Sequence, residues 1–233
     1  NVVAGTKPSH SLLNTDATPA CFWITHPDNI LVGNRAAGSP NYGFWMDYQE
    51  TSIGPSFDPN IKPIKAKLGE FRNNVAHSVG RYGLRIFHSH EPTQLAYYED
   101  HLSYMCGLRG IMAQDLGRIV FRNVTLTDNP VNLEFIHVTL GSGEVNVNHA
   151  EDLTMIGVSN GNPGKNSFGI IAPQSDTWLV TEARFYNFRD GSAAIGDCSH
   201  CDDMILGDAG GRTVRFSKLF FDSTVDAKVR FRI

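Results

Sequence analysis

The sequence FWITHPDNILVGNRAAGSPNYGFWMDY, residues 22–48, decides the fold. Two aromatic-rich runs, FWI at 22–24 and YGFW at 42–45, flank the apolar run ILV at 30–32. Asn, Gly and Pro residues separate the three runs, and these residues favour turns. Runs of this length and composition predict short β-strands joined by tight bends.

The same arrangement of a short apolar or aromatic run followed by Asn, Asp or Gly recurs along the chain. It is found at 69–74 with 82–86, at 119–123 with 133–136, at 153–157, at 183–187, and at 213–216 with 221–222. Imperfect repeats of short strands indicate a solenoid. The alternative is an antiparallel β-sandwich, but the Asn-Gly hairpin turns typical of antiparallel strands are scarce. We therefore expect an all-β parallel β-helix, with Asn side chains forming ladders at the bends.

We expect residues 1–233 to form a single β-helical segment with loops inserted near 49–68, 88–118 and 157–169. Three prolines mark the first loop, and a turn-rich sequence marks the third. The second is the longest, and we expect a short helix at 94–105 within it.

Composition limits the classes of function. A hydrophobic fraction of 41% in 233 residues is ordinary for a folded protein. A net charge of −4 without a basic cluster argues against a nucleic-acid partner. No run approaches the about 20 apolar residues that cross a bilayer, so we expect no membrane contact within this segment. The chain starts without Met and ends in a strand-like pattern, so we expect a fragment of a longer chain.

The four cysteines include one CxxC pair, Cys198 and Cys201. A second pair at zinc-site spacing is absent, and no βαβ pattern supports a redox CxxC. The favoured interpretation is a disulfide, either within the pair or to Cys21 or Cys106, as expected in an oxidising compartment. Unpaired buried thiols are the main alternative, and a metal site is the weakest.

His88 and His90 would lie on one face of an extended strand, because strand side chains alternate. Together with Glu91, Asp100 or His101 they are weak candidates for a zinc site, against the simpler interpretation of solvated loop histidines. No Gly-rich phosphate loop opens a helix, and we expect no cofactor.

Three further features are candidates for function. Asn123 begins an Asn-Val-Thr acceptor sequence for N-glycosylation. Trp23 and Trp45, with Phe44 and Tyr48, are candidates for an aromatic platform that stacks on sugar rings, although core packing is the more common role of such residues. Acid–base chemistry on glycans needs two carboxylates at a defined separation. No spacing selects a pair, so the catalytic residues stay unknown, among Asp47, Glu50, Glu70, Asp115, Glu134, Glu182 and Asp190.

Several blocks of this sequence resemble the fibrocystin-L-like family and its relatives, the cell-surface and secreted hyaluronan-degrading proteins. The blocks are residues 22–48, GPS at 54–56, LGEFRNNVAHSVGRYGLRIF at 68–87, GSAAIGDCSHC at 191–201 and GGRTVRFSKLFFDS at 210–223. The resemblance covers about residues 20–231 and implies a right-handed parallel β-helix in a large extracellular chain. It also implies a cell-surface location, often ciliary in this family. The residues tied to activity in the hyaluronidases match nothing here, so the resemblance implies no catalytic residue.

These observations favour a structural or adhesive extracellular segment that contacts other segments of its own chain and extracellular protein or glycan partners. Two alternatives stay open. One is a glycan-degrading, hyaluronidase-like enzyme segment, which the missing catalytic pair makes the less favoured interpretation. The other is a carbohydrate-binding module without turnover.

Overall fold

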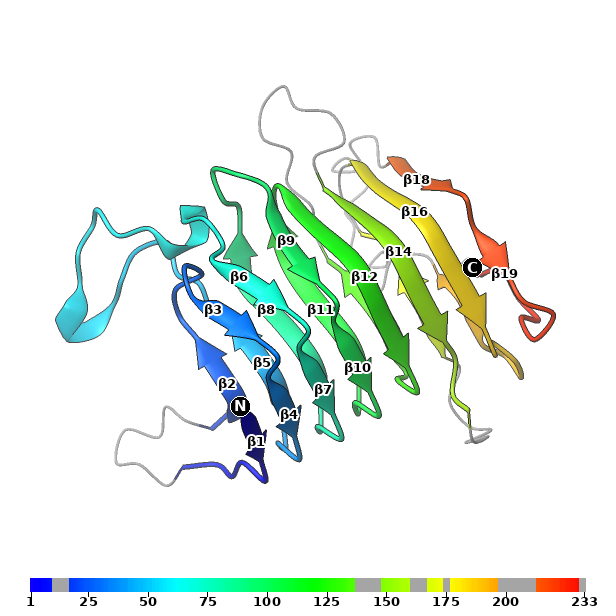
Figure 1. Ribbon diagram of the computed structural model, residues 1–233, viewed down its shortest axis with the longest axis horizontal. Helices are drawn as coiled ribbons and strands as arrows, with labels where there is room; N and C mark the ends of the chain where they lie inside the picture. The colour runs from blue at the N-terminus through cyan, green and yellow to red at the C-terminus, as the bar shows by residue number, and fades with distance from the viewer. Residues whose placement is uncertain (10–16, 137–147, 160–166, 174–176, 197–212, 231–233) are drawn as a thin grey trace, which may run out of the picture.

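The computed structural model describes residues 1–9, 17–136, 148–159, 167–173, 177–196 and 213–230. The strands in this part of the chain form two sheets, one 12-stranded and one 8-stranded. The strands lie side by side, and successive strands follow one another along the molecule from the blue N-terminal end to the red C-terminal end (Figure 1). Within the described residues every strand pairing is parallel.

The strands are short, as their separation by turn residues predicts. The 12-stranded sheet contains β1 (Val2–Ala4), β3 (Ile30–Val32), β4 (Arg35–Ala37), β6 (Glu70–Arg72), β7 (Val75–His77), β9 (Ala96–Glu99), β10 (Leu102–Tyr104), β12 (Ile119–Thr127), β14 (His149–Ile156), β16 (Thr177–Tyr186), β18 (Thr213–Ser217) and β19 (Phe220–Phe221). The 8-stranded sheet contains β2 (Ala20–Ile24), β5 (Tyr42–Met46), β8 (Tyr82–His90), β11 (Arg109–Leu116), β13 (Val131–Phe135), β15 (Phe168–Ile171), β17 (Ala193–Gly196) and β20 (Val229–Arg230).

The chain passes back and forth between the two sheets. After β2 of the 8-stranded sheet it forms β3 and β4 of the 12-stranded sheet, and then β5 returns to the first. We call one strand of the 8-stranded sheet, with the strand or strands that follow it in the other, a rung. Each strand pairs with its equivalent in the next rung, which is why the pairing is parallel. The expected all-β class with parallel strands is confirmed, and the antiparallel sandwich is excluded.

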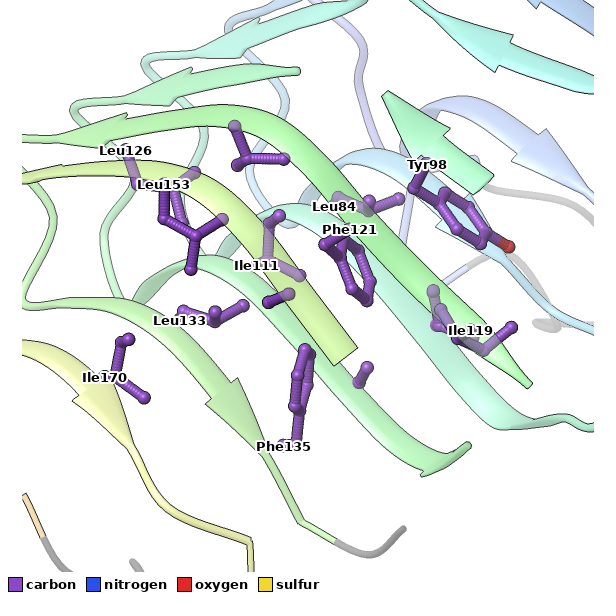
Figure 2. Close-up of a cluster of buried hydrophobic side chains, with 14 of the residues drawn as sticks. Leu84, Tyr98, Ile111, Ile119, Phe121, Leu126, Leu133, Phe135, Leu153 and Ile170 are labelled. Carbon is purple, nitrogen blue, oxygen red and sulfur yellow. The ribbon is translucent and has the colours of Figure 1, made fainter. Parts of the chain in front are cut away.

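The core lies between the sheets, and equivalent positions stack along it. One apolar column follows the register of the 8-stranded sheet through Phe22, Phe44, Leu84, Ile111, Leu133, Ile170 and Ile195. Phe121 on the opposite sheet lies between the rings of Tyr98 and Phe135, at 5.3 and 5.2 Å between ring centroids. Figure 2 shows the middle of this core, where Leu84, Ile111 and Leu133 of the 8-stranded sheet point toward Phe121 of the 12-stranded sheet. Burial of this continuous apolar column is the main stabilising contribution.

Positive-φ residues explain the recurrent Asn, Asp and Gly. One column of them falls at the bend within the 12-stranded sheet and comprises Gly33, Asn73, Asp100, Asn123, Asp152, Glu182 and Lys218, with φ between 50° and 69°. A second follows β4 and its equivalents: Gly38, Ser78, Met105, Asp128 and Asn187. Gly, Asn and Asp enter this left-handed region at the lowest cost. The repeated bend is therefore encoded by one residue per rung.

The position after the first bend points inward and carries a short polar ladder. Asn34, Asn74 and His101 occupy it in three successive rungs, and all three are buried. The backbone N–H and the Nδ2 of Asn34 donate to Oδ1 of Asn74, at 2.9 and 3.0 Å. Asn74 in turn donates from Nδ2 to the Leu31 carbonyl at 2.6 Å. The predicted Asn ladder is present, and it satisfies polar groups that burial would otherwise leave unpaired.

Two expectations about the loops need correction. The helix expected at 94–105 is wrong, because β9 and β10 occupy that segment. Burial alternates along Ala96–Glu99, the period of a strand rather than a helix. The loop expected at 88–118 is mostly strand as well, since β8 extends to His90 and β11 begins at Arg109.

The remaining expected loops lie in irregular chain or outside the described residues. Residues 49–68 join β5 to β6 and contain two 3₁₀ turns, η1 (Gly54–Ser56) and η2 (Pro63–Lys65). Most of 157–169 lies outside the described residues. In the described part of the chain no helix has the length and apolar character needed to span a membrane.

Candidate functional site

The outer face of the 8-stranded sheet collects an unusual set of side chains near the N-terminal end. The register places Trp23, Trp45, Arg85, Met112 and Glu134 in one column across five strands. A second column, three residues earlier in each strand, comprises Ala20, Tyr42, Tyr82, Arg109 and Val131. Parallel in-register strands thus bring together aromatic and charged residues that are far apart in the sequence.

Trp23 and Trp45 form a stacked pair on this face. Their ring centroids are 5.5 Å apart with an interplanar angle of 15°. Trp23 is 52% exposed, and its Nε1 donates to Oδ2 of Asp47 at 3.1 Å. Phe44 and Tyr48, grouped with them in the sequence analysis, are instead buried in the core. The four aromatics therefore divide between a surface pair and a core pair.

A pocket of about 290 Å³ opens beside the tryptophan pair. It is lined by Lys7, Ser9, Thr18, Pro19, Ala20, Trp23 and Trp45. The carbonyl of Pro19 accepts hydrogen bonds from the Tyr42 N–H and the Ser39 hydroxyl, which fixes this wall of the pocket to the sheet. A flat indole wall with one lysine beside it suits a polar ring with an apolar face.

Arg85 lies among four aromatic rings. The guanidinium carbon is 4.1 Å from the ring centroid of Phe87, 4.8 Å from Tyr42, 5.3 Å from Trp45 and 5.9 Å from Tyr82. Nη1 donates to the Tyr42 hydroxyl oxygen at 2.7 Å. Burial among these rings lowers the pKa of Arg85 from its ordinary value.

Arg109 and Glu134 form an ion pair on the same face. The Glu134 side chain is 1% exposed, whereas that of Arg109 is 22% exposed. The second carboxylate oxygen of Glu134, Oε1, is buried and has no hydrogen-bond partner. Because the two charges are paired with each other, neither is free to bind a ligand. The pair instead helps to hold β11 and β13 together on this face.

The two candidate histidines lie on opposite sides of the sheet, so the expectation that they share one face is wrong. His88 is 57% exposed, and its Nε2 is 4.0 Å from Oδ1 of Asp47. His90 is fully buried and contacts the Tyr98 hydroxyl at 3.1 Å through Nδ1. The cause is a bulge in the pairing of β8 with β11, which adds one residue to β8 after Ile86 and breaks the alternation. Within the described residues no group of three or more His, Cys, Asp or Glu is arranged to hold a metal ion.

A second pocket, of about 420 Å³, lies where the 49–68 loop meets β8. Its lining comprises Tyr48, Gln49, Glu50, Thr51, Ile53, Ile64, His88, Ser89 and Asp115. Asp47 lies next to it, because Gln49 donates to Oδ1 of Asp47 at 2.9 Å. Four of the candidate groups, Asp47, Glu50, Asp115 and His88, are thus near this pocket.

The other candidate carboxylates are dispersed. Glu70 pairs with Arg72, and Glu182 pairs with Lys218, both on the 12-stranded sheet. Asp190 is exposed, and its backbone N–H donates to the Asp226 carboxylate at 3.2 Å. None of these three contributes to the outer face of the 8-stranded sheet.

The remaining predicted sites lie elsewhere. Asn123 is exposed at the bend of its rung, where its Nδ2 donates to Oδ1 of Asp100 at 2.6 Å. Cys21 and Cys106 are free thiols. Cys198 and Cys201 lie outside the described residues.

Tyr42, Tyr82 and Arg85 are members of the face that were not expected from the sequence. The signal was present as the repeat Tyr-Gly-Phe-Trp at 42–45 and Tyr-Gly-Leu-Arg at 82–85. These two segments are in register, residue for residue, in β5 and β8. The glycine in each is required by close approach of the next strand, since a Cβ on Gly43 would lie 2.6 Å from the Gly83 carbonyl oxygen.

Comparison with known proteins identifies relatives over the same region. The family model described as CEMIP beta-helix matches residues 2–84. Fibrocystin-L of Mus musculus is 32% identical over 93% of this chain, and fibrocystin-L of Homo sapiens is 30% identical over 100% of it. The cell surface hyaluronidase of Danio rerio is 40% identical over 36% of the chain. The chain spans only 6% of the length of each of these relatives.

The family-model match and the fibrocystin-L similarity both agree with the parallel β architecture. The CEMIP beta-helix match covers β1 to the start of β8, which contain Trp23, Trp45 and most of the aromatic face. The fibrocystin-L similarity extends over the rungs that follow. The chain therefore belongs to the fibrocystin-L-like family, with the cell-surface hyaluronidases as its relatives.

Proposed function

We propose that residues 1–233 form one right-handed parallel β-helical segment of a large extracellular fibrocystin-L-like protein, with a structural and adhesive role. Stacked columns on the inside and one bend residue per rung support a stiff body. Relatives whose names place them at the cell surface support the extracellular location. The outer face of the 8-stranded sheet is the contact surface, and its partner is a glycan.

The observation that carries this proposal is the stacked pair of Trp23 and Trp45. Trp23 is a large aromatic side chain on a rigid sheet, and 52% of it is exposed to water. A partner that covers this apolar surface removes it from water, which favours binding. The C–H face of a sugar ring matches a flat indole, while the adjacent pocket offers polar groups for its hydroxyls. Because Trp45 and Asp47 hold the Trp23 ring in place, little conformational entropy is lost on binding.

A glycan array with purified protein tests the adhesive role. We expect selective binding by the wild type and its loss in Trp23→Ala. The matched control is Phe220→Ala, which removes an aromatic that is 50% exposed on the other sheet and should leave binding unchanged. Equal binding by the wild type and Trp23→Ala, or no selective binding by either, would contradict the proposal.

A second candidate function is hydrolysis or lyase cleavage of a glycan. Two observations favour it: the 40% identity to a cell surface hyaluronidase over 36% of the chain, and the pocket that gathers His88, Glu50 and Asp115. Incubation with hyaluronan followed by sizing of the products decides between the two. Shortened chains that persist in Trp23→Ala but not in His88→Ala would support the enzyme, whereas unchanged chain length would remove it.

A further inference from the structure

Arg85 lies among aromatic rings, whereas several other arginines on the surface lie beside a carboxylate. Arg109, Arg122 and Arg184 each pair with a carboxylate. Arg85 has no carboxylate of the described residues within ion-pair distance, although it is partly buried among Phe87, Tyr42, Trp45 and Tyr82. A cation partly withdrawn from water reduces stability, and neither the ring faces nor the electrostatic attraction of Asp47, which lies beyond ion-pair distance, offsets all of that cost.

The hydrogen-bond donors of this cluster are also incompletely used. Nη1 of Arg85 donates to the Tyr42 hydroxyl at 2.7 Å, whereas Nε is buried without a partner. Nη2 makes no hydrogen bond to the described residues and is not among the buried unpaired atoms, so it reaches solvent. Nε1 of Trp45, next to the guanidinium, is likewise buried and unpaired. Buried donors without partners are uncommon in folded proteins, so this cluster has unused donor capacity, and Nη2 is the donor of Arg85 that a ligand can reach.

The acidic groups nearby are already committed. Asp47 accepts hydrogen bonds from Trp23 and Gln49 through its two different oxygens. Glu134 is paired with Arg109. Within the described residues no carboxylate hydrogen-bonds to the Arg85 guanidinium, so its solvent-facing Nη2 is open to an anion from outside.

We propose that Arg85, with Trp45 and the tyrosines around it, is a binding site for an oxyanion, a carboxylate or a sulfate, carried on a ring that stacks on the outer face. The planar guanidinium presents Nη2 to the anion in the plane of its fork, which favours oxyanions over other groups. The stacked Trp23 and Trp45 receive the ring. This inference rests on the proposed contact face, and it adds the chemical class of the ligand, an acidic glycan rather than a neutral one.

The test compares three hexasaccharides by isothermal titration calorimetry: a neutral glucose hexamer, a uronic acid hexamer bearing carboxylates, and a sulfated galactose hexamer. We expect the wild type to bind at least one acidic hexamer about tenfold or more tightly than the neutral one, as expected for a charge-assisted contact. Arg85→Met should abolish this preference, and Arg85→Lys should restore part of it. The carboxylate and sulfate arms distinguish the two anions.

Arg184→Met is the matched control. It removes the same charge from an exposed arginine paired with Asp152 on the 12-stranded sheet, and it should preserve the preference. Circular dichroism and thermal unfolding of each variant show whether it is folded. An equal affinity of the wild type for neutral and acidic hexamers, or a preference that survives in Arg85→Met, overturns the inference.

A titration with inorganic sulfate separates this inference from the proposed function. The Arg85 Nε–H signal in a ¹⁵N-resolved NMR spectrum should shift with sulfate in the wild type. A shift without binding of any hexasaccharide supports the anion site and removes the glycan. No shift and no hexasaccharide binding overturns both.

Discussion

Two histidines buried in the core make the fold sensitive to mild acid. His101 continues the inner polar ladder, where its Nε2 contacts the Ser103 hydroxyl at 2.8 Å and the rings of Phe44 and Phe71 lie around it. Burial lowers the pKa of His101 to about 3 and that of His90 to about 4, from an ordinary value of 6.5. The folded protein therefore holds both imidazoles neutral at a pH where the unfolded chain protonates them.

The sign and size of the effect follow from this difference. Since the unfolded chain binds more protons, the free energy of unfolding falls as the pH decreases from 6.5 toward the folded-state pKa values. In this window each histidine lowers the free energy of unfolding by about 1.4 kcal/mol per pH unit. The reduction reaches about 2 kcal/mol per histidine at pH 5. Two histidines together give a loss of about 4 kcal/mol between pH 7.5 and pH 5. Asp128 and Asp222, whose pKa values are lowered by hydrogen bonds to hydroxyl and backbone groups, act only in more acidic solution.

Urea unfolding at pH 7.5, 6 and 5 measures the effect in the wild type and in His101→Asn. Asparagine is the natural choice, because Asn34 and Asn74 occupy the same position of the preceding rungs. The free energy of unfolding of the variant should fall by about 2 kcal/mol over this range, instead of the about 4 kcal/mol expected for the wild type. His88→Asn, at a position 57% exposed, is the control and should keep the full pH dependence. The same loss in His101→Asn as in the wild type would refute the reasoning.

Four further predictions test separate parts of the structure. Gly83→Ala should unfold the protein or cost several kcal/mol in thermal denaturation, because its Cβ would lie 2.7 Å from a backbone oxygen of the next strand. Gly33→Asn should be tolerated, since open space surrounds Gly33 and asparagine adopts its φ of 69°. Arg109→Ala should cost about 3–5 kcal/mol in urea unfolding, because it leaves the Glu134 carboxylate buried and unpaired; a cost below about 1 kcal/mol would contradict that burial. Protein secreted from animal cells should carry a glycan at Asn123, detected as a mass decrease on glycosidase treatment that is absent in Asn123→Gln.

Much of the fold could be predicted from residues 22–48 because the fold repeats itself. The bend within the 12-stranded sheet needs a residue with positive φ in every rung. Gly33, Asn73, Asp100 and Asn123 therefore recur at equivalent positions. Apolar residues at fixed offsets from that bend then identify the strands. The inner Asn ladder was also predictable, since a buried bend selects side chains that bond to neighbouring backbone groups.

The parts that could not be predicted depend on contacts between rungs. One inserted residue in β8 moves His88 to the outer face, and no local pattern marks it because the bulge exists only relative to β11. The segment 94–105 has helix-compatible residues, but pairing of β9 with β12 overrides local preference. The surroundings of Arg85 come from two strands 40 residues apart, so the cluster of rings around its guanidinium is visible only once β5 and β8 are in register.

The contact face can be tested most directly through the three tryptophans of the chain. Each indole N–H gives one signal in a ¹H–¹⁵N spectrum, and Trp178 is buried in the core, away from the face. On titration with the uronic acid or sulfated hexasaccharide, the signals of Trp23 and Trp45 should shift while that of Trp178 stays in place. Shifts confined to residues of the 12-stranded sheet, with Trp23 and Trp45 unchanged at saturation, would contradict the account.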